Sequence, residues 1–488
     1  MNRRTFLSLA CATGLLSLLP SGVGAAVDLR VGQPLRLPPR IHAGRRGLSE
    51  LTAGYGSYDL GAGSHTGGML INQQWPSPTL AFSQGDELDL TLQNQLTEPT
   101  IIHWHGLTPP ADMDGHPIYA IGPGASRPYQ FAVDNRPATY WYHPHPHHRT
   151  AAQVYYGMAG FLLVDDGQDE ARGLPTGSRD IPLLLADRRV TANGELEPYA
   201  PSMPEMMVGF LGDTMLVNGQ VYPTLSTEPA VIRLRLLNGS TARILNPAFA
   251  DGRSFWLVAT DAGLLDAPIE VNNVLLSPGE RIEILVDLRD AADSTLQLVS
   301  APFTITATHP PVITQPPHGA GFDLMSIMVN QPLESPSGTI PGSFEAMPTI
   351  DSSDAPIRNF TLTQDGPDHL INGMQFDLER VDFEVPFDTV EIWRFSNFSN
   401  QPHPMHMHAT HFRVIARSGT PTPTDAGWKD TVLVHVGETV DIALRFKVPG
   451  LFLLHCHNLE HEDHGMMLNF VVAEEERDDR LFTDRFEQ

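Results

Sequence analysis

The sequence of 488 residues has only two cysteines, Cys11 and Cys456. Cys11 lies in an N-terminal segment that we expect to be cleaved off, which would leave Cys456 alone. A single cysteine cannot form a disulfide within the chain, so a fold stabilised by disulfides is excluded. Cys456 stands between two histidines in "LLHCHNLEHEDHGMM", which begins at Leu453, and this setting predicts a metal ligand or a nucleophile.

Hydrophobic runs long enough to span a membrane are absent as well. The run from Phe6 to Leu19 has 14 residues, which is short for a membrane span. It follows Arg3 and Arg4 and precedes the small residues "SGVGAA", so residues 1–26 predict an export signal. The paired arginines resemble a twin-arginine signal, and an ordinary secretory signal is the alternative. We therefore expect the twin-arginine export machinery as a partner and a periplasmic or otherwise exported monomer, with no membrane segment after removal of the signal.

Positive charge is scarce. The chain has 31 Lys and Arg against 57 Asp and Glu, a formal net charge of −26. Residues 1–26 contain two arginines and no acid, so their removal would leave −28. This charge excludes nucleic acid and anionic membranes as partners, because both would be repelled, and it is compatible with neutral or cationic small substrates.

The 41 glycines and 42 prolines recur at intervals, which favours short strands joined by turns over long helices. One pattern occurs three times: an Asn, a bend, a run of alternating apolar and polar residues, and a second Asn. The copies run between residues 72 and 94, 218 and 238, and 372 and 397. Alternation is the signature of a half-buried strand. We therefore predict an all-β protein of three β-sandwich domains with Greek-key strand order, at 45–168, 178–310 and 350–475, and we expect 310–355 to be a linker or long loop.

Histidines occupy matched places in the first and third copies. Nine residues after the second Asn, copy one has His103 and His105, and copy three has His406 and His408. One further His-x-His pair follows later in each of these two copies, His143 with His145 after the first and His455 with His457 after the third. Copy two has none of these pairs, so we expect the 178–310 domain to contribute no metal ligand.

The His-x-His spacing predicts a metal centre. Residues i and i+2 of a strand point to the same face, so each pair aims two imidazoles at one place, and the four pairs can converge between domains one and three. Imidazoles without a carboxylate suit copper better than calcium or magnesium, and eight exceed the four ligands of one zinc ion. Cys456 would face the opposite side of its strand and bind a separate metal, with partners among His403, His461 and Met466, as in blue-copper sites.

The segments "HWHG", "WYHPH", "HPMHMH" and "HCHNLEHEDHGMM" resemble the four copper motifs of the multicopper oxidases. The resemblance covers nearly all of the chain after the signal and is nearest to the three-domain bacterial laccases and the periplasmic copper-efflux oxidase. It implies three cupredoxin-like domains and four copper ions. It implies the following ligands: for the type 1 copper, His403, Cys456, His461 and Met466; for the type 2 copper, His103 and His406; for the type 3 coppers, His105, His143 and His457 on one and His145, His408 and His455 on the other.

Two acids also match the family. Asp114 lies where relatives place an acid near the type 2 copper, and Glu462 matches an acid that relays protons toward the type 3 pair. Reduction of dioxygen to two waters needs four protons, which such acids deliver. The alternative for each is a solvated loop carboxylate.

The resemblance implies oxidation of a reductant coupled to reduction of dioxygen, and it leaves the reductant open. A laccase-like enzyme would oxidise phenols and aromatic amines that approach His403 or His461. A periplasmic cuprous oxidase serving copper homeostasis would need soft ligands there, and "FSNFSNQP" before His403 has neither Met nor Asp. Met203, Met206 and Met207 could meet copper(I), although packing is the simpler interpretation. A copper-sequestering protein is the third alternative. We favour the laccase-like enzyme.

Overall fold

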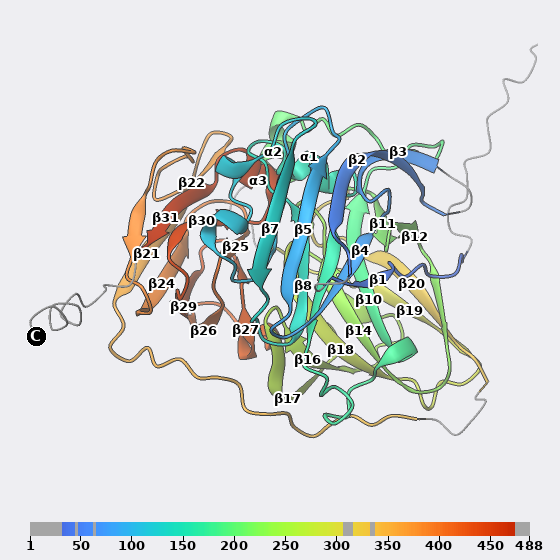
Figure 1. Cartoon of the computed structure of the whole chain (residues 1–488). Helices are drawn as coiled ribbons and strands as arrows, with labels where there is room; N and C mark the ends of the chain where they lie inside the picture. The colour runs from blue at the N-terminus through green and yellow to red at the C-terminus, as the bar shows by residue number, and fades with distance from the viewer. Residues whose placement is uncertain (1–31, 44–46, 62–64, 306–315, 332–336, 474–488) are drawn as a thin grey trace, which may run out of the picture.

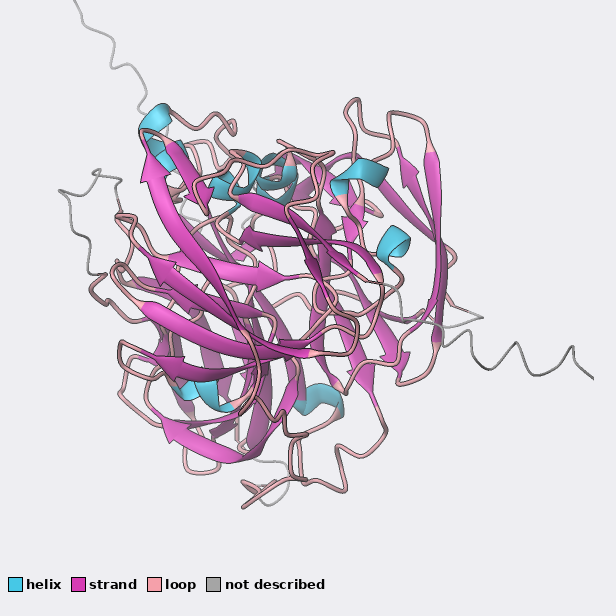
Figure 2. Cartoon of the chain, turned by 90° about the vertical axis from the view of Figure 1, so that its left-hand side faces the viewer, coloured by secondary structure: helices cyan, strands magenta, loops and turns pink. Residues whose placement is uncertain are grey.

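The computed structural model describes residues 32–43, 47–61, 65–305, 316–331 and 337–473. The predicted export signal at residues 1–26 lies outside the described residues. Strands dominate the molecule and the helices are short (Figure 2). In the described part of the chain, no helix has the length and hydrophobicity that crossing a bilayer requires. The prediction of an all-β fold of three cupredoxin-like sandwiches is confirmed.

The first sandwich pairs a five-stranded sheet, of order β1-β4-β9-β8-β6, with a four-stranded sheet, of order β3-β2-β5-β7. Both sheets contribute to one buried cluster that includes Leu51, Phe82, Leu90 and Leu162. The strands are β1 (Arg40–His42), β2 (Glu50–Asp59), β3 (His65–Ile71), β4 (Ser77–Ser83), β5 (Glu87–Asn94), β6 (Ile102–His103), β7 (Ser126–Ala132), β8 (Ala138–Pro144) and β9 (Gly160–Asp165).

The second sandwich pairs a seven-stranded sheet, of order β12-β11-β10-β14-β18-β16-β17, with a four-stranded sheet, of order β13-β20-β19-β15. The strands are β10 (Asp180–Arg188), β11 (Thr214–Val217), β12 (Gln220–Val221), β13 (Thr224–Thr227), β14 (Val231–Asn238), β15 (Pro247–Phe249), β16 (Phe255–Thr260), β17 (Gly263–Val271), β18 (Arg281–Asp287), β19 (Ser294–Ser300) and β20 (Phe322–Val329). Strand β20 lies in the segment expected as a linker or long loop. That expectation is wrong for Phe322–Val329, because these residues pair with β13 and β19 and bury Leu324 and Met325 in the core.

The third sandwich pairs a six-stranded sheet, of order β22-β21-β24-β29-β26-β27, with a five-stranded sheet, of order β23-β31-β30-β25-β28. The strands are β21 (Ile357–Asp365), β22 (Asp368–Ile371), β23 (Phe383–Val385), β24 (Val390–Asn397), β25 (His403–Met407), β26 (Phe412–Arg417), β27 (Trp428–Lys429), β28 (Thr431–Val434), β29 (Thr439–Arg445), β30 (Gly450–Cys456) and β31 (Met467–Val472). The domain boundaries expected from the sequence stay a prediction.

Three short α-helices lie together at one end of the molecule, where α3 contacts both α1 and α2 (Figure 1). The helices are α1 (Thr150–Tyr155), α2 (Met203–Val208) and α3 (Leu459–Asp463), with 3-10 turns η1 (Ala111–Met113), η2 (Pro117–Tyr119), η3 (Gly177–Arg179) and η4 (Pro423–Ala426). The carboxylate of Asp463 accepts hydrogen bonds from the backbone amides of Thr150 and Ala151 at 2.9 and 3.0 Å. Helix α1 is thereby joined to the segment that carries the last histidine motif.

The repeated asparagines have a physical explanation. Asn72, Asn218 and Asn372 occupy tight turns at φ of 52°, 49° and 54°, a left-handed conformation that Asn adopts more readily than most residues. The second asparagine of each copy is buried at the end of a strand. In the copies that carry histidines, these residues are Asn94 and Asn397. There each amide bonds to backbone groups of the following loop, such as Leu96 N and Ile121 O for Asn94. Each copy therefore fixes the loop that leads to its next strand.

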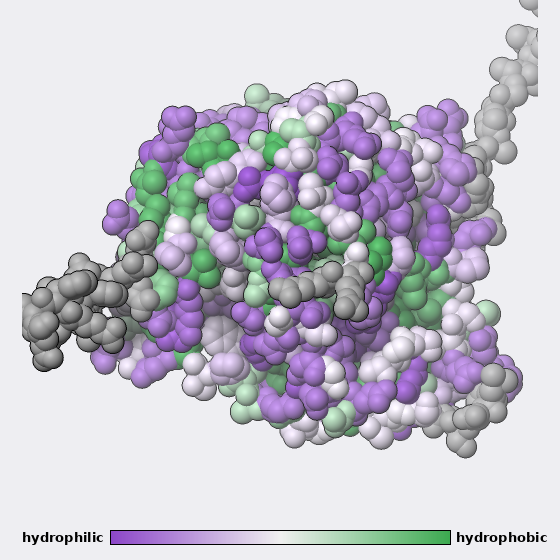
Figure 3. All heavy atoms as spheres, viewed as in Figure 1, coloured by the Kyte–Doolittle hydropathy of each residue, from purple (hydrophilic) through white to green (hydrophobic). Residues whose placement is uncertain are grey.

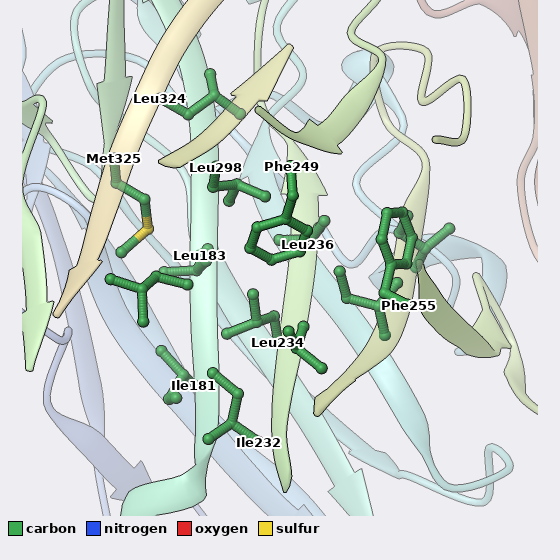
Figure 4. Packing of buried hydrophobic residues seen from close by; sticks show 14 of the residues in the cluster. Ile181, Leu183, Ile232, Leu234, Leu236, Phe249, Phe255, Leu298, Leu324 and Met325 are labelled. Atoms are coloured by element: carbon green, nitrogen blue, oxygen red, sulfur yellow. The ribbon is translucent and has the colours of Figure 1, made fainter. Parts of the chain in front are cut away.

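The apolar side chains of the second sandwich form the core shown in Figure 4, in which Leu234 on β14 is fully buried. On the outside, hydrophilic residues are spread over the face in Figure 3, and hydrophobic residues lie between them in separate groups.

Replacement of Leu234 by Ala should lower the free energy of unfolding by about 2–5 kcal/mol, because it removes buried contacts and leaves a cavity. Thermal unfolding of the purified protein measures the effect. Met328→Ala on β20, whose side chain is 42% exposed, is the control and should change the unfolding temperature little. Equal effects of the two substitutions would contradict the assignment of Leu234 to the core.

Candidate metal centre

Strand pairing brings the four His-x-His pairs together. In the first sandwich β6 pairs with β8, so that His103 is opposite His143. In the third sandwich β25 pairs with β30, so that His406 is opposite His455. All eight imidazoles are buried, with at most 1% of their surface exposed. Residues from the two sandwiches meet directly, since the rings of His103 and His408 are stacked with centroids 3.8 Å apart.

The imidazoles of His103 and His406 are oriented so that both could bind one cation. The Nδ1 atoms of His103 and His406 lie 2.7 and 2.9 Å from the backbone oxygens of Asp114 and Asp430. A carbonyl can only accept, so each Nδ1 carries the proton and each Nε2 presents a lone pair. The two Nε2 atoms face each other at 3.3 Å. Two acceptors cannot hydrogen-bond to each other, whereas both can bind one metal ion.

His145, His408 and His455 form a second group of imidazoles that face one another. The Nδ1 atoms of His408 and His455 face acceptors, namely Asp114 Oδ2 at 2.5 Å and Cys456 O at 3.1 Å. Their Nε2 atoms therefore carry lone pairs, and these lie 3.1 Å apart. His145 Nε2 is 3.3 Å from the same atom of His455. The three ring nitrogens converge on one point and could hold a metal ion.

A further group consists of His105, His143 and His457. Here His105 Nδ1, His143 Nε2 and both ring nitrogens of His457 are buried without a hydrogen-bond partner. Buried polar atoms without partners are rare in folded proteins, and each needs an explanation. The three rings lie within 5.0–5.6 Å of one another, centroid to centroid, so that one ion could satisfy a nitrogen of each.

The protonation state of the cluster fits metal binding. Burial lowers the pKa of each of the histidines His103, His105, His143, His406 and His408 well below the usual value, and neighbouring imidazoles lower it further. The imidazoles are consequently neutral at physiological pH, as metal ligands must be. Neutral imidazole nitrogens suit copper.

Cys456 belongs to a second centre behind the same strand. Its Sγ atom lies 3.5 Å from His403 Nδ1 and 3.7 Å from His461 Nδ1. Burial raises the pKa of the thiol above its usual range, so that without a cation it stays protonated. Met466 is fully buried beside the pair, where its carbonyl accepts from Cys456 N and its amide donates to His461 O. One thiol, two imidazoles and an adjacent thioether are the donor set of a blue-copper site.

The outer edges of the two imidazoles in this second centre are covered. His461 Nε2 donates to Met207 O at 3.1 Å, and His403 Nε2 lies 2.7 Å from Ser399 Oγ. The ring of His369 on β22 lies against that of His461, with centroids 3.8 Å apart and planes tilted by 31°. His403 and His461 are both fully buried, so the expectation that a phenol approaches one of them directly is wrong for this structure.

The two expected acids both contact the histidine cluster. Asp114 bonds to His408 through Oδ2 and to His103 through its carbonyl oxygen, and burial raises the pKa of its carboxyl group well above the usual value. Glu462 lies between two histidines, with Oε2 at 3.0 Å from His455 Nδ1 and Oε1 at 3.5 Å from His145 Nε2. Burial raises the pKa of Glu462, but the facing imidazoles outweigh burial and the net shift is downward.

Sequence reasoning missed a buried ion-pair network that reaches the cluster from the second sandwich. Asp430 Oδ1 lies 3.0 Å from His105 Nε2, which directs Nδ1 of that ring into the cluster. Arg281 on β18 bonds to both carboxylate oxygens of Asp430, at 2.8 and 2.6 Å. Asp261 and Lys429 complete the network, and all four side chains are nearly or fully buried. The described residues of the second sandwich thus offer no histidine to the cluster, but Arg281 orients one through Asp430.

These residues carried no signal in the sequence. Asp430 follows a lysine in "GWKDTVLV" and has no spacing relation to the histidine motifs. His369 in "DHLING" is a single histidine, a pattern more typical of ordinary packing. Only the tertiary structure shows what they touch.

The chain belongs to the multicopper oxidase family. Sequence models of multicopper oxidases match residues 52–169 and 349–476, which contain all of the histidine motifs. Members of this family bind copper and couple the oxidation of a reductant to the reduction of dioxygen.

Individual relatives differ in their described roles. The multicopper oxidase mco of Staphylococcus aureus is 33% identical over 86% of this chain and 89% of its own length. The cell division protein FtsP of Escherichia coli is 30% identical over 97% of this chain and 99% of its length. Among solved structures, the McoA multicopper oxidase of Aquifex aeolicus has a TM-score of 0.83 at 34% identity, covering 91% and 100% of the two chains. A laccase-like multicopper oxidase from Ochrobactrum, described as active towards lignin model compounds, has a TM-score of 0.82 at 31% identity, covering 90% and 100%.

The network yields a prediction about stability. Arg281→Met should leave Asp430 charged, buried and without its cationic partner, which typically costs about 3–5 kcal/mol. Thermal unfolding of copper-free protein measures this loss without interference from metal binding.

Arg394→Met is the matched control, because Arg394 also bonds to both oxygens of a carboxylate, that of Asp441, but its side chain is 38% exposed. Exposed pairs contribute about 0–1 kcal/mol. If the two substitutions lowered the unfolding temperature equally, the buried network would not hold the sandwiches together as described.

Proposed function

We propose that the protein is a four-copper oxidase with laccase-like activity toward phenols and aromatic amines. One observation carries the proposal. The consecutive residues His455, Cys456 and His457, at the end of β30 and just after it, contact two candidate centres: the histidines lie in the histidine cluster and Cys456 lies in the second centre. The assigned ligands are His403, Cys456, His461 and Met466 for type 1 copper; His103 and His406 for type 2; His105, His143 and His457, and His145, His408 and His455, for the type 3 pair.

Copper bound at the two centres would supply the one-electron oxidation of a reductant and the four-electron reduction of dioxygen to water. The chain contributes the connection between them, since Cys456 is covalently joined to His455 and His457. Asp114 contacts His408 and Glu462 contacts His455, and we assign both acids to hold and transfer protons there. Both acids are fully buried.

A periplasmic cuprous oxidase for copper tolerance is the second candidate, and one observation favours it. Helix α2 brings Met203, Met206 and Met207 next to α3, and the carbonyl of Met207 bonds to His461. Thioethers near the type 1 site suit copper(I). Only Met203 is an exposed methionine of this helix, and Met207 packs against Val208, Leu211 and Ala242, which supports packing as the main role.

A copper-sequestering or structural protein is less well supported. Such a role is compatible with the similarity to FtsP, but it gives no reason for joining a thiolate site to a histidine cluster through one strand. We further propose that residues 1–26 direct export by the twin-arginine route to the periplasm, that the chain acts as a monomer, and that the three domains have the boundaries expected from the sequence.

Dioxygen consumption by fully copper-loaded protein tests the proposal. We expect consumption with 2,6-dimethoxyphenol and no added copper. Consumption with copper(I), and with the phenol only when extra copper is added, would favour the cuprous oxidase. No consumption with either reductant would favour a non-enzymatic role.

The substitution Cys456→Ser should abolish the blue thiolate-to-copper absorption while the fold is kept, because serine is a poor ligand for this site. Visible absorption and far-ultraviolet circular dichroism of the copper-loaded variant measure the two properties. A blue Cys456→Ser protein would refute the type 1 assignment.

The substitution His145→Ala should stop dioxygen consumption and leave the blue absorption in place, since His145 lies in the histidine cluster and not beside Cys456. His65→Ala, at an exposed histidine on β3, is the control and should retain full activity. Full turnover by His145→Ala would mean that the cluster is not the site of dioxygen reduction.

A further inference from the structure

The type 1 centre proposed above is closed on its outer side. His403 and His461 are fully buried, and the ring nitrogen of each that points away from Cys456 is already hydrogen-bonded, to Ser399 and Met207 respectively. An organic reductant therefore needs a neighbouring group that connects the surface with one of these imidazoles.

Tyr199 and Glu460 form such a connection. Glu460 directly precedes His461 on α3, and its Oε1 accepts a hydrogen bond of 3.0 Å from the hydroxyl of Tyr199. The ring of Tyr199 packs against Tyr155 and Phe210, with centroids 5.4 and 4.9 Å away. Its backbone amide donates to the hydroxyl of Tyr156 at 2.9 Å. Tyr199 is thus held rigidly, with its hydroxyl one hydrogen bond and one peptide unit from a type 1 ligand residue.

Tyr199 also lines a cavity of about 640 Å³, to which Ala152 of α1 contributes as well. The wall opposite is formed by β2 and β3, including Tyr55 and Gly67, and Tyr156 and Leu196 contribute further apolar surface. This volume lies within the roughly 300–1,000 Å³ typical of small-molecule sites, and aromatic walls with a few polar groups are their usual lining.

We propose that this cavity is the binding site for phenolic reductants, and that the hydrogen bond from Tyr199 to Glu460 carries the electron from the cavity to His461. The inference rests on the proposed oxidase function and adds the place at which the reductant binds. A bound phenol packs against the rings of Tyr156 and Tyr199.

The charges at the cavity select the class of reductant. Arg149 and Glu195 line it, and the two carboxylate oxygens of Glu98 already bind the Arg149 guanidinium. Because Glu98 neutralises the Arg149 guanidinium and the formal net charge of the chain is −26, the site favours neutral phenols over anionic ones. In each turnover step the phenol loses one electron and its hydroxyl proton to give a phenoxyl radical. Copper(II), if bound by His403, Cys456 and His461, would accept the electron, and the proton is released to water at the mouth of the cavity.

A substitution that fills the cavity tests the binding site. Gly67 has ordinary backbone angles, and a Cβ atom added there meets nothing within 4 Å, so Gly67→Phe introduces a ring without strain. Isothermal titration of the copper-loaded enzyme with 4-cyanophenol, a phenol too electron-poor to be oxidised readily, measures binding. We expect the dissociation constant to rise at least about tenfold, equivalent to 1.4 kcal/mol. Gly122→Phe, at another open glycine of the first sandwich, is the control and should bind as the wild type does.

A second variant tests the electron path independently of the cavity's shape. Tyr199→Phe keeps the ring and removes only the hydroxyl that bonds to Glu460. Anaerobic stopped-flow bleaching of the blue absorption compares 2,6-dimethoxyphenol with ferrocyanide, an anionic complex that does not enter the cavity. The ratio of the phenol rate to the ferrocyanide rate, each taken at a saturating concentration of reductant, should fall about tenfold.

The outcomes separate this inference from the proposed function. If the wild type oxidises the phenol, but Gly67→Phe binds 4-cyanophenol as tightly as the wild type, the binding site is overturned and the oxidase function stands. An unchanged rate ratio in Tyr199→Phe overturns the electron path in the same way. A wild-type enzyme whose blue absorption is bleached by neither reductant overturns the oxidase function, and this inference with it.

Discussion

The alternation of side chains along strand β30 is the constraint on which both candidate centres depend. Consecutive residues of a strand point to opposite faces, so His455 and Cys456 cannot serve the same metal. Pairing with β25 sets the register, which places His406 opposite His455 and Met405 opposite Cys456. The neighbouring strand thereby adds imidazoles on one face and apolar cover on the other. Two candidate metal sites with different donor sets follow from this alternation, and the backbone of consecutive residues connects them.

The histidine cluster additionally requires that three sandwiches be held in fixed positions. Its imidazoles come from the first and third sandwiches, and Arg281 of the second sandwich holds Asp430, which orients His105. Burying this ion pair is costly and is tolerated because every carboxylate oxygen of Asp430 has a partner. A sandwich without metal ligands therefore has a clear role in the site.

Much of this arrangement could be predicted from the sequence, because the relevant signals are local. Strand alternation and the asparagine turns predicted three sandwiches, and matched His-x-His spacing predicted which residues converge. Strand β20 was missed because a run rich in Pro, Gly and Ser surrounds Phe322–Val329, and its place is decided by pairing with β13 and β19. Asp430, His369 and Tyr199 were missed because their roles come from contacts with residues distant in the sequence. The covered edge of His461 was also unforeseen, since the covering carbonyl belongs to Met207, more than 250 positions earlier.

The central claim is that Cys456 joins a single-copper site to a three-copper cluster within one chain. Anaerobic titration of the fully copper-loaded protein with dithionite counts the electrons that the metal centres accept. The account predicts about four electron equivalents per chain, with the blue absorption bleached during the titration and restored when dioxygen is admitted. Uptake of about one equivalent would show an isolated blue-copper site and contradict the account.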